Sequence, residues 1–285
     1  MPTHNPVRAR ILGGTALLAG LLASVLPAQA ADAPAITAQQ VIERNAAARG
    51  GLEAWRRVQS LQTSGTMDAN LPMSLRPDNR TLVDKQGKVL PQPEGLDKVV
   101  SLPYARTSKR PHSSRVELVV DGKTAVQIFD GATGWKQRPF LNRTDFEAYT
   151  PAEQKLAAQE PELDGYLIDA ARKKIAVVVE GTDVIEGRKA YRLKVTPPGA
   201  DGRHIWVDAQ TFLEVRFEGV RRLDGKQHTV YTYLRDYKDF NGLKLPTLTE
   251  TVTDGLPGSE KLRVEKVVVN PAVDEALFHR PTASH

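Results

Sequence analysis

The chain has 285 residues, no cysteine and a formal net charge of +5. The absence of cysteine excludes disulfide bonds, thiol catalysis and cysteine metal sites, and it also excludes a lipid-modified cysteine. The mild positive charge indicates no particular partner, and we expect no nucleic-acid binding.

The first thirty residues have the pattern of a targeting sequence. Arg8 and Arg10 precede the apolar run ILGGTALLAGLLASVL, and an A-x-A site ends at Ala30. This pattern is typical of a secretory signal peptide that is cleaved after Ala30. An uncleaved membrane anchor is the alternative, but the apolar run is short for a bilayer span. We therefore expect residues 31–285 to form a single exported domain.

The mature chain should begin with helix and then continue as strand. Thr37 and Gln40 match a capping box, which predicts two short helices that end near Val58. Leu61–Met67 should form the first strand. Residues 68–97 are rich in Pro, Asn, Asp and Gly, which predicts an irregular exposed insertion.

Strands should resume near Val99, with one further helical interruption. Thr150 and Glu153 match a second capping box, so a helix should run from there to about Arg172 with a break near Pro161. The remaining chain predicts a series of strands joined by turns: Ile175–Ile185, Tyr191–Thr196, His204–Asp208, Phe212–Gly219, Gln227–Tyr237, Leu243–Val252 and Glu260–Asn270. A total of ten to twelve antiparallel strands with few helices favours a sandwich or barrel whose sheet the helices cover or plug.

The sequence holds no motif that predicts catalysis. G-x-S-x-G and H-E-x-x-H are both absent. His204 and His228 could meet across neighbouring strands, although two solvent-facing strand residues are the simpler explanation. The acidic residues near Asp236 lack an accompanying base or nucleophile. We expect no catalytic residues, no metal and no cofactor.

Alternating apolar residues indicate the inner face of a curved sheet. They occupy three successive strands and comprise Tyr191, Leu193, Val195, Ile205, Val207, Leu213, Val215 and Phe217. Inner faces of β-barrels either fill with side chains or enclose a ligand cavity. The apolar pattern alone leaves both possibilities open.

The stretch that ends at Asn241–Gly242 predicts one arm of a β-hairpin. Val230, Thr232 and Leu234 should point to one side of this strand, and its tyrosines should point to the other. Both sides therefore need neighbours that accept apolar or aromatic groups.

Several segments together resemble the LolA-like outer-membrane lipoprotein-sorting protein family of Gram-negative bacteria. The segment EGTDVIEGRKAYRLKVTPPGADGRHIWVDAQTFLEVRFEG is followed by YKDFNGLKLPTLTE and VVVNPAVDEALFHRP. Upstream lie ERNAAARGGLEAWRRVQSLQTSG and FDGATGWKQ. The resemblance spans roughly residues 37–281 and depends on the order and spacing of these pieces.

This resemblance implies a mainly β (α+β) fold, a half-open antiparallel β-barrel of about eleven strands with a helical lid. It further implies a periplasmic, monomeric, non-enzymatic carrier of lipoproteins or lipid acyl chains, with an inner-membrane donor and an outer-membrane acceptor. The alternative is a periplasmic sensor or scaffold that binds a protein partner. On the carrier hypothesis, the cavity lining should comprise Leu193, Val195, Ile205, Val207, Leu213, Val215 and Phe217, with Trp135, Tyr231 and Tyr233 near the mouth.

Overall fold

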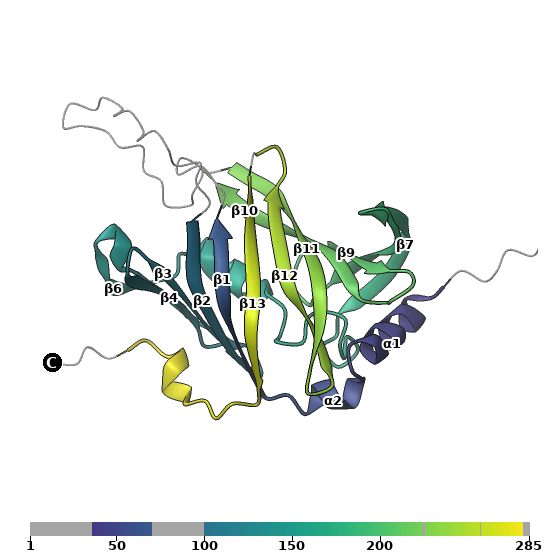
Figure 1. Ribbon diagram of the computed structural model, residues 1–285, viewed down its shortest axis with the longest axis horizontal. Coiled ribbons are helices and arrows are strands. Elements are labelled where there is room, and N and C mark those ends of the chain that lie inside the picture. The colour runs from purple at the N-terminus through teal and green to yellow at the C-terminus, as the bar shows by residue number, and fades with distance from the viewer. Residues whose placement is uncertain (1–35, 70–99, 224–225, 257, 282–285) are drawn as a thin grey trace, which may run out of the picture. The chain divides into compact units, whose positions relative to one another are not determined.

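The computed structural model describes residues 36–69, 100–223, 226–256 and 258–281. The predicted signal peptide and the predicted insertion at 68–97, apart from its first two residues, lie outside the described residues. Figure 1 shows an antiparallel sheet with helices gathered near one end and behind it. In the part of the chain that the structure describes, no helix has the length and apolar character needed to cross a membrane.

The sheet contains thirteen strands among the described residues, so the count is slightly higher than the expected eleven. The strands are β1 Ser60–Ala69, β2 Val100–Lys109, β3 Ser113–Val120, β4 Lys123–Phe129, β5 Gly134–Arg138, β6 Arg143–Ala148, β7 Ala176–Ile185, β8 Arg188–Thr196, β9 Arg203–Asp208, β10 Glu214–Leu223, β11 Lys226–Phe240, β12 Leu243–Thr253 and β13 Ser259–Val269. The helices are α1 Ala38–Ala48, α2 Leu52–Arg56 and α3 Pro151–Gln159, with short 3₁₀ helices η2 Pro139–Leu141 and η3 Glu275–Phe278.

The strand order shows why part of the chain must cover the sheet. The order is β6-β5-β4-β3-β2-β1-β13-β12-β11-β10-β9-β8-β7, so β6 and β7 are the two edges and the sheet is not closed. Because β6 and β7 are consecutive in sequence, the chain between them has to travel from one edge to the other. This connection carries α3 and the turn segment (residues 160–174) across one face of the sheet, which we call the inner face.

Both predicted capping boxes are confirmed. The Thr37 side chain accepts a hydrogen bond from the Gln40 N–H, and the Gln40 side chain accepts one from the Thr37 N–H. Thr150 and Glu153 form the same reciprocal pair at α3. These bonds satisfy amide groups that a helix start otherwise leaves unpaired.

The predicted helix to Arg172 is wrong beyond Gln159. Glu160 precedes Pro161 and has extended geometry, with φ −61° and ψ 147°. The proline ring disfavours helical geometry for the residue before it, which ends α3 there. Turns follow, with positive φ at Gly165, Asp169 and Lys174, and this irregular segment nevertheless buries several of its side chains.

Two apolar clusters fill part of the inner face. The first joins β7, β8 and β9 to helix α1 and the turn segment through Val41, Tyr166, Leu167, Leu193, Val195, Ile205 and Val207. The second packs Trp55 and Val58, at and just after α2, against β1, β12 and Ile168. The hairpin turn predicted at Asn241–Gly242 is confirmed, since both residues have positive φ, 56° and 83°.

Candidate functional cavity

A cavity of about 1210 Å³ lies on the inner face beside the filled region. Its walls come from strands on both sides of the sheet centre, and α3 and the turn segment supply its cover. A smaller cavity of about 430 Å³ shares several of the same lining residues, including Arg106 and Leu156. The larger volume exceeds the range of about 300–1,000 Å³ that is usual for small-molecule pockets.

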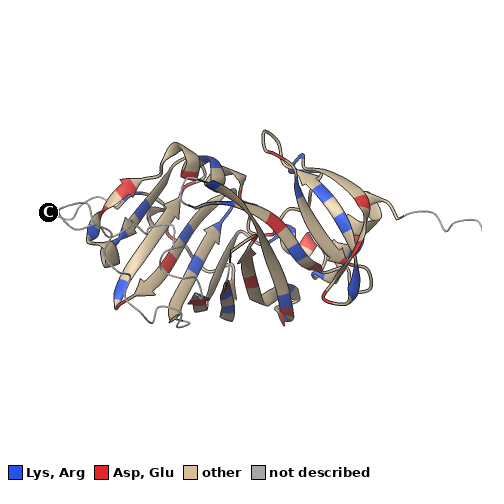
Figure 2. Cartoon of the chain, turned by 90° about the horizontal axis from the view of Figure 1, so that it is seen from above, with Lys and Arg blue, Asp and Glu red and all other residues tan. Residues whose placement is uncertain are grey.

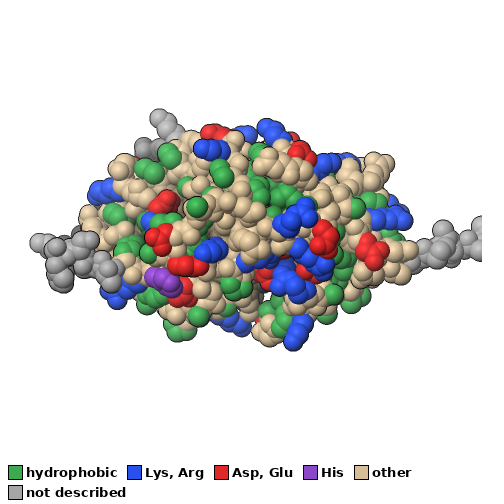
Figure 3. Space-filling model, turned by 90° about the horizontal axis from the view of Figure 1, so that it is seen from below, with side chains coloured by type: hydrophobic (Ala, Val, Ile, Leu, Met, Phe, Trp, Pro, Cys, Tyr) green, Lys and Arg blue, Asp and Glu red, His purple; other side chains and the backbone are tan. Residues whose placement is uncertain are grey.

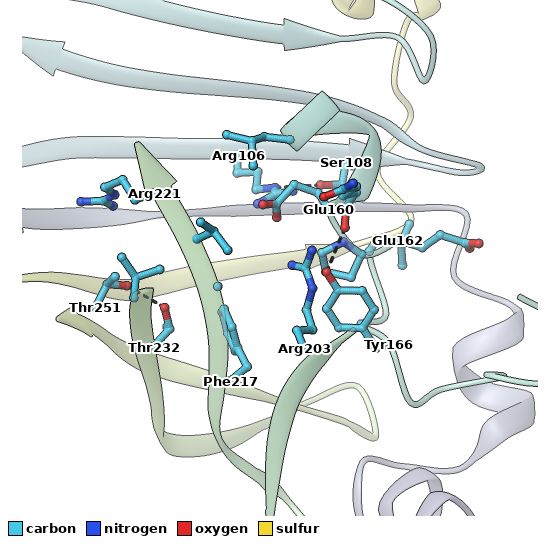
Figure 4. A pocket seen from close by; sticks show the side chains of 18 of the residues that line it. Arg106, Ser108, Glu160, Glu162, Tyr166, Arg203, Phe217, Arg221, Thr232 and Thr251 are labelled. Atoms are coloured by element: carbon cyan, nitrogen blue, oxygen red, sulfur yellow. Dashed lines mark hydrogen bonds between the residues drawn. The ribbon is translucent and has the colours of Figure 1, made fainter. Parts of the chain in front are cut away.

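The wall on the β10–β11 side is formed by one face of the hairpin. Val230, Thr232 and Leu234 all line the cavity, as does Phe217 from the neighbouring strand. Thr232 and Thr251 share a hydrogen bond of 2.9 Å across β11 and β12, as Figure 4 shows. The hydroxyl groups are therefore satisfied within the sheet, and their methyl groups add to the apolar part of this wall.

Tyr237 lies on the cavity side, although simple alternation places it with Tyr231 and Tyr233. Asp236, just before it, has a positive φ of 54°, which breaks the alternation of side chains along β11. The Tyr237 hydroxyl donates to the Glu214 carbonyl oxygen at 3.0 Å. Burial raises the pKa of Tyr237, so its hydroxyl stays protonated and remains a donor.

Helix α3 covers the cavity with few apolar contacts. None of its residues is buried, and Leu156, which lines both cavities, is 42% exposed. Polar bonds to β5 and the preceding turn hold the helix: Glu153 pairs with Lys136, and the Gly134 N–H donates to the Gln154 side chain at 3.0 Å. A cover attached in this way should open at small energetic cost.

The turn segment, in contrast, is anchored by a buried ion cluster. The Asp164 side chain is 1% exposed and pairs with Lys173 and with Arg110, the latter at 2.6 Å. Arg110 also pairs with Glu162, and Arg49 donates to the Asp164 carbonyl oxygen at 2.8 Å. Burial lowers the pKa of Lys173, and the Asp164 carboxylate opposes this effect.

Ion pairs in the same part of the chain also join a buried carboxylate to partly exposed arginines. Asp169 pairs with Arg56 at 2.9 Å and with Arg172 at 3.0 Å. Seen from below in Figure 3, basic and acidic side chains gather next to one another on this face, with apolar groups scattered between them. The surface therefore shows alternating charge here rather than one continuous apolar patch.

The structure brings only two of the ten predicted lining residues to the cavity wall. Ile205 and Phe217 line it. Leu193, Val195 and Val207 lie on the same face but are each 0% exposed, because Val41 and Leu167 pack against that part of the sheet. Leu213 is half-buried just before β10 and is not among the lining residues.

The other four predicted lining residues lie on the opposite, outer face. A bulge between Glu214 and Arg216 shifts the register, so Val215 packs with Trp206, Tyr231 and Tyr233. The Arg216 guanidinium lies 3.8 Å from the Trp206 ring centre and 4.9 Å from that of Tyr231. Charged residues of both signs follow the strands of this sheet, as Figure 2 shows.

Trp135 lies on the outer face of β5. It packs against Phe278 of η3 together with Val126 and Ile128 of β4. Since β4 alternates, its Gln127 and Phe129 line the smaller cavity on the inner face. Phe278 thus helps to form a separate small core on the outer face, and Trp135 belongs to this core rather than to the mouth of the cavity.

Sequence reasoning missed the polar part of the lining. Arg106, Arg203 and Glu160 all face the cavity, and Figure 4 shows Arg203 beside Tyr166. Arg106 lies in the basic stretch RTSKRPHSSR. Its position on β2, where alternate residues face inward, is the signal that could have identified it.

Two simple enzymatic features find no support in the described geometry. Among the described residues, no group of three His, Asp or Glu side chains could hold a metal ion. His204 does not meet His228 but lies between Glu218 and Glu180, at 2.6 and 3.0 Å. These residues form a bonded network on the outer face, away from the cavity.

No protein-family model and no curated protein sequence matches this chain. Solved structures do. A LolA superfamily protein from Nitrosomonas europaea matches with 13% sequence identity and a TM-score of 0.54, over 86% of this chain and 98% of that one. The chain has the LolA-like fold.

Two further structures agree with this assignment of the LolA-like fold. A DUF1329 family protein from Desulfovibrio piger is 11% identical, with a TM-score of 0.53 over 85% of this chain and 97% of that one. A domain from Vibrio parahaemolyticus, named for outer membrane lipoprotein sorting, is 10% identical, with a TM-score of 0.50 over 84% of this chain and 94% of that one. The expected mainly β class and the open antiparallel sheet are therefore confirmed.

Proposed function

We propose that this protein is a periplasmic carrier that shields lipid acyl chains, of outer-membrane lipoproteins or of another lipid, in the cavity under α3. The observation that carries the proposal is the 1210 Å³ space between the open sheet and a helix that buries none of its residues. The LolA-like fold supports it, since one protein of this fold is named for lipoprotein sorting.

The physical task of such a carrier is to replace water around the acyl chains. Each methylene group that moves from water to an apolar wall gains about 0.8 kcal/mol. Phe217, Val230 and Leu234 supply such a wall on the strand side, and Leu156 supplies it on the cover. Release to an acceptor requires the cover to open, which the weak packing of α3 favours. We expect the carrier to act as a monomer that receives the lipid from an inner-membrane donor and then releases it to an outer-membrane acceptor.

Filling the cavity tests this proposal directly. Leu234→Trp places a large ring in the space, whereas Val184→Trp places the same ring on the edge strand β7, outside the cavity lining, at a residue that is 72% exposed. We expect an uncharged pyrene-labelled fatty alcohol to bind the wild-type protein and the Val184 variant, and to bind Leu234→Trp at least about tenfold more weakly. Circular dichroism confirms that each variant is folded. Equal binding by all three proteins contradicts the carrier function, as does a failure of the wild-type protein to bind either this alcohol or the matching fatty acid.

A sensor or scaffold remains the second candidate because of one surface feature. Val178 and Val184 are 57% and 72% exposed on β7, an edge strand that pairs only with β8 among the described residues. A partner could extend the sheet at this edge. Val184→Lys should then abolish a stable complex and leave binding of the fatty alcohol unchanged.

A further inference from the structure

The cavity wall holds more positive than negative side chains. Seven arginines or lysines and four glutamates line it. Five of the seven cations form ion pairs with carboxylates. The other two, Arg106 on β2 and Arg203 on β9, form no ion pair with any described residue. A purely apolar ligand would not explain why two arginines without ion pairs line the cavity.

The described partners of each guanidinium are neutral, with Tyr104 and Ser108 beside Arg106 and Tyr166 beside Arg203, so no carboxylate compensates either charge. Arg106 donates from Nε to the Ser108 hydroxyl at 3.2 Å, and no described carboxylate lies close enough to pair with it. Arg203 lies over the Tyr166 ring at 5.3 Å, and its Nε is buried without a hydrogen-bond partner among the described atoms. Figure 4 shows both side chains reaching into the pocket from different strands.

The acidic residues of the wall do not cancel this charge. Glu153, Glu162 and Glu214 are each paired with a lysine or arginine. Glu160 is the one lining carboxylate that forms no ion pair with a described residue. Two cations and one anion are thus left without partners, which favours a ligand that brings negative charge.

We propose that the cavity selects an amphiphile with an anionic head group, a carboxylate or a phosphate, whose oxygens accept hydrogen bonds from Arg106 and Arg203. This inference rests on the proposed function, since the acyl chain would lie along the apolar wall at Phe217 and Leu234. The planar guanidinium group presents parallel N–H donors that match both kinds of oxyanion. The buried Nε of Arg203 would gain its missing partner.

A pair of probes that differ only in the head group tests the inference. We expect a pyrene-labelled fatty acid to bind the wild-type protein at least about tenfold more tightly than the matching alcohol, because a hydrogen bond to a charged group is worth more than one to a neutral group. Arg106→Gln and Arg203→Gln should each weaken acid binding about tenfold and leave alcohol binding unchanged. Lys194→Gln, an exposed change outside the cavity lining, is the charge-matched control. A lysophosphatidic acid probe distinguishes phosphate from carboxylate.

The outcomes separate this inference from the carrier function. If the alcohol binds as tightly as the acid, or if neither arginine variant discriminates between them, the head-group inference is wrong and the carrier proposal stands. If neither probe binds, both are wrong. Glu160→Gln is an independent test. This variant removes a negative charge from the cavity wall and should tighten binding of the acid several-fold. Weaker acid binding in that variant would also overturn the inference.

Discussion

The inner face has two parts with similar strands: one is filled by a packed core, and the other borders the open cavity. Under β7, β8 and β9, Leu193 and Val195 are fully buried because Val41 of α1 and Leu167 of the turn segment pack onto them. On β10 and β11, Leu234 and its neighbours face the open cavity, and α3, which also lines that cavity, has no buried residue of its own. The strands thus determine which side is inner, and the covering segments determine whether that side is filled.

The two halves of the connection between β6 and β7 explain this difference. The turn segment is fixed by Asp164, Lys173 and Arg110, whose side chains are at most 15% exposed. Helix α3 is fixed by Lys136 and by the partly exposed Glu153. One half of the connection therefore acts as part of the core, and the other acts as a movable cover.

The largest effect should come from breaking the buried anchor. Asp164→Asn leaves Lys173 buried without a carboxylate and leaves Arg110 with Glu162 alone, and loss of one member of a buried ion pair costs about 3–5 kcal/mol. Urea denaturation measures the change in the free energy of unfolding. The exposed pair of Lys109 and Glu275 is the control, and Glu275→Gln should cost about 1 kcal/mol or less. Similar losses in the two variants would show that the turn segment is not anchored as described.

A smaller effect distinguishes the filled and hollow parts of the inner face. Leu193→Ala creates a new void in a packed core and should cost about 2–5 kcal/mol. Leu234→Ala enlarges a cavity that already exists, so the variant loses only the transfer free energy of the half-buried Leu234 side chain. The cost should be about 1 kcal/mol. Both values come from the same denaturation experiment. If Leu234→Ala proves as costly as Leu193→Ala, the cavity is packed in solution and the contrast disappears.

Much of the fold follows from local sequence patterns. The capping boxes at Thr37 and Thr150 and the turn at Asn241–Gly242 each depend on a few neighbouring residues, and each is confirmed. Alternation also identified the inner face of β8 and β9 correctly, since Leu193 and Ile205 both lie there. Patterns of this kind are readable because strand and turn geometry impose them locally.

The lining was less predictable because one irregular residue in a strand changes which face the residues after it occupy. The bulge near Val215 moves that residue to the outer face, and positive φ at Asp236 brings Tyr237 inward. A strand repeats every two residues, so one irregular position inverts the assignment of its neighbours. Filling of the wall under β8 depends on Val41 and Leu167, which lie far away in sequence. Neither effect leaves a local signature.

The smallest expected effect concerns the attachment of α3. Although burial opposes it, hydrogen bonds from Lys136 and Thr150 hold the pKa of Glu153 below its ordinary value. A carboxylate with a lowered folded-state pKa stabilises the folded arrangement fully above its unfolded pKa of about 4.3, and this contribution is lost as the pH falls through the folded-state value. Acid should therefore weaken the attachment of α3 as Glu153 becomes protonated.

Hydrogen exchange, corrected for the intrinsic rate at each pH, measures this release. We expect protection of the α3 amides in residues 151–159 to fall once the pH is low enough to protonate Glu153, below the ordinary glutamate pKa, while β8 keeps its protection. Glu153→Gln should lower α3 protection at neutral pH and remove its dependence on acid. The same fall in the Gln variant would assign the effect to another group. Unchanged protection of α3 in both proteins would show that the pair of Lys136 and Glu153 does not hold the cover.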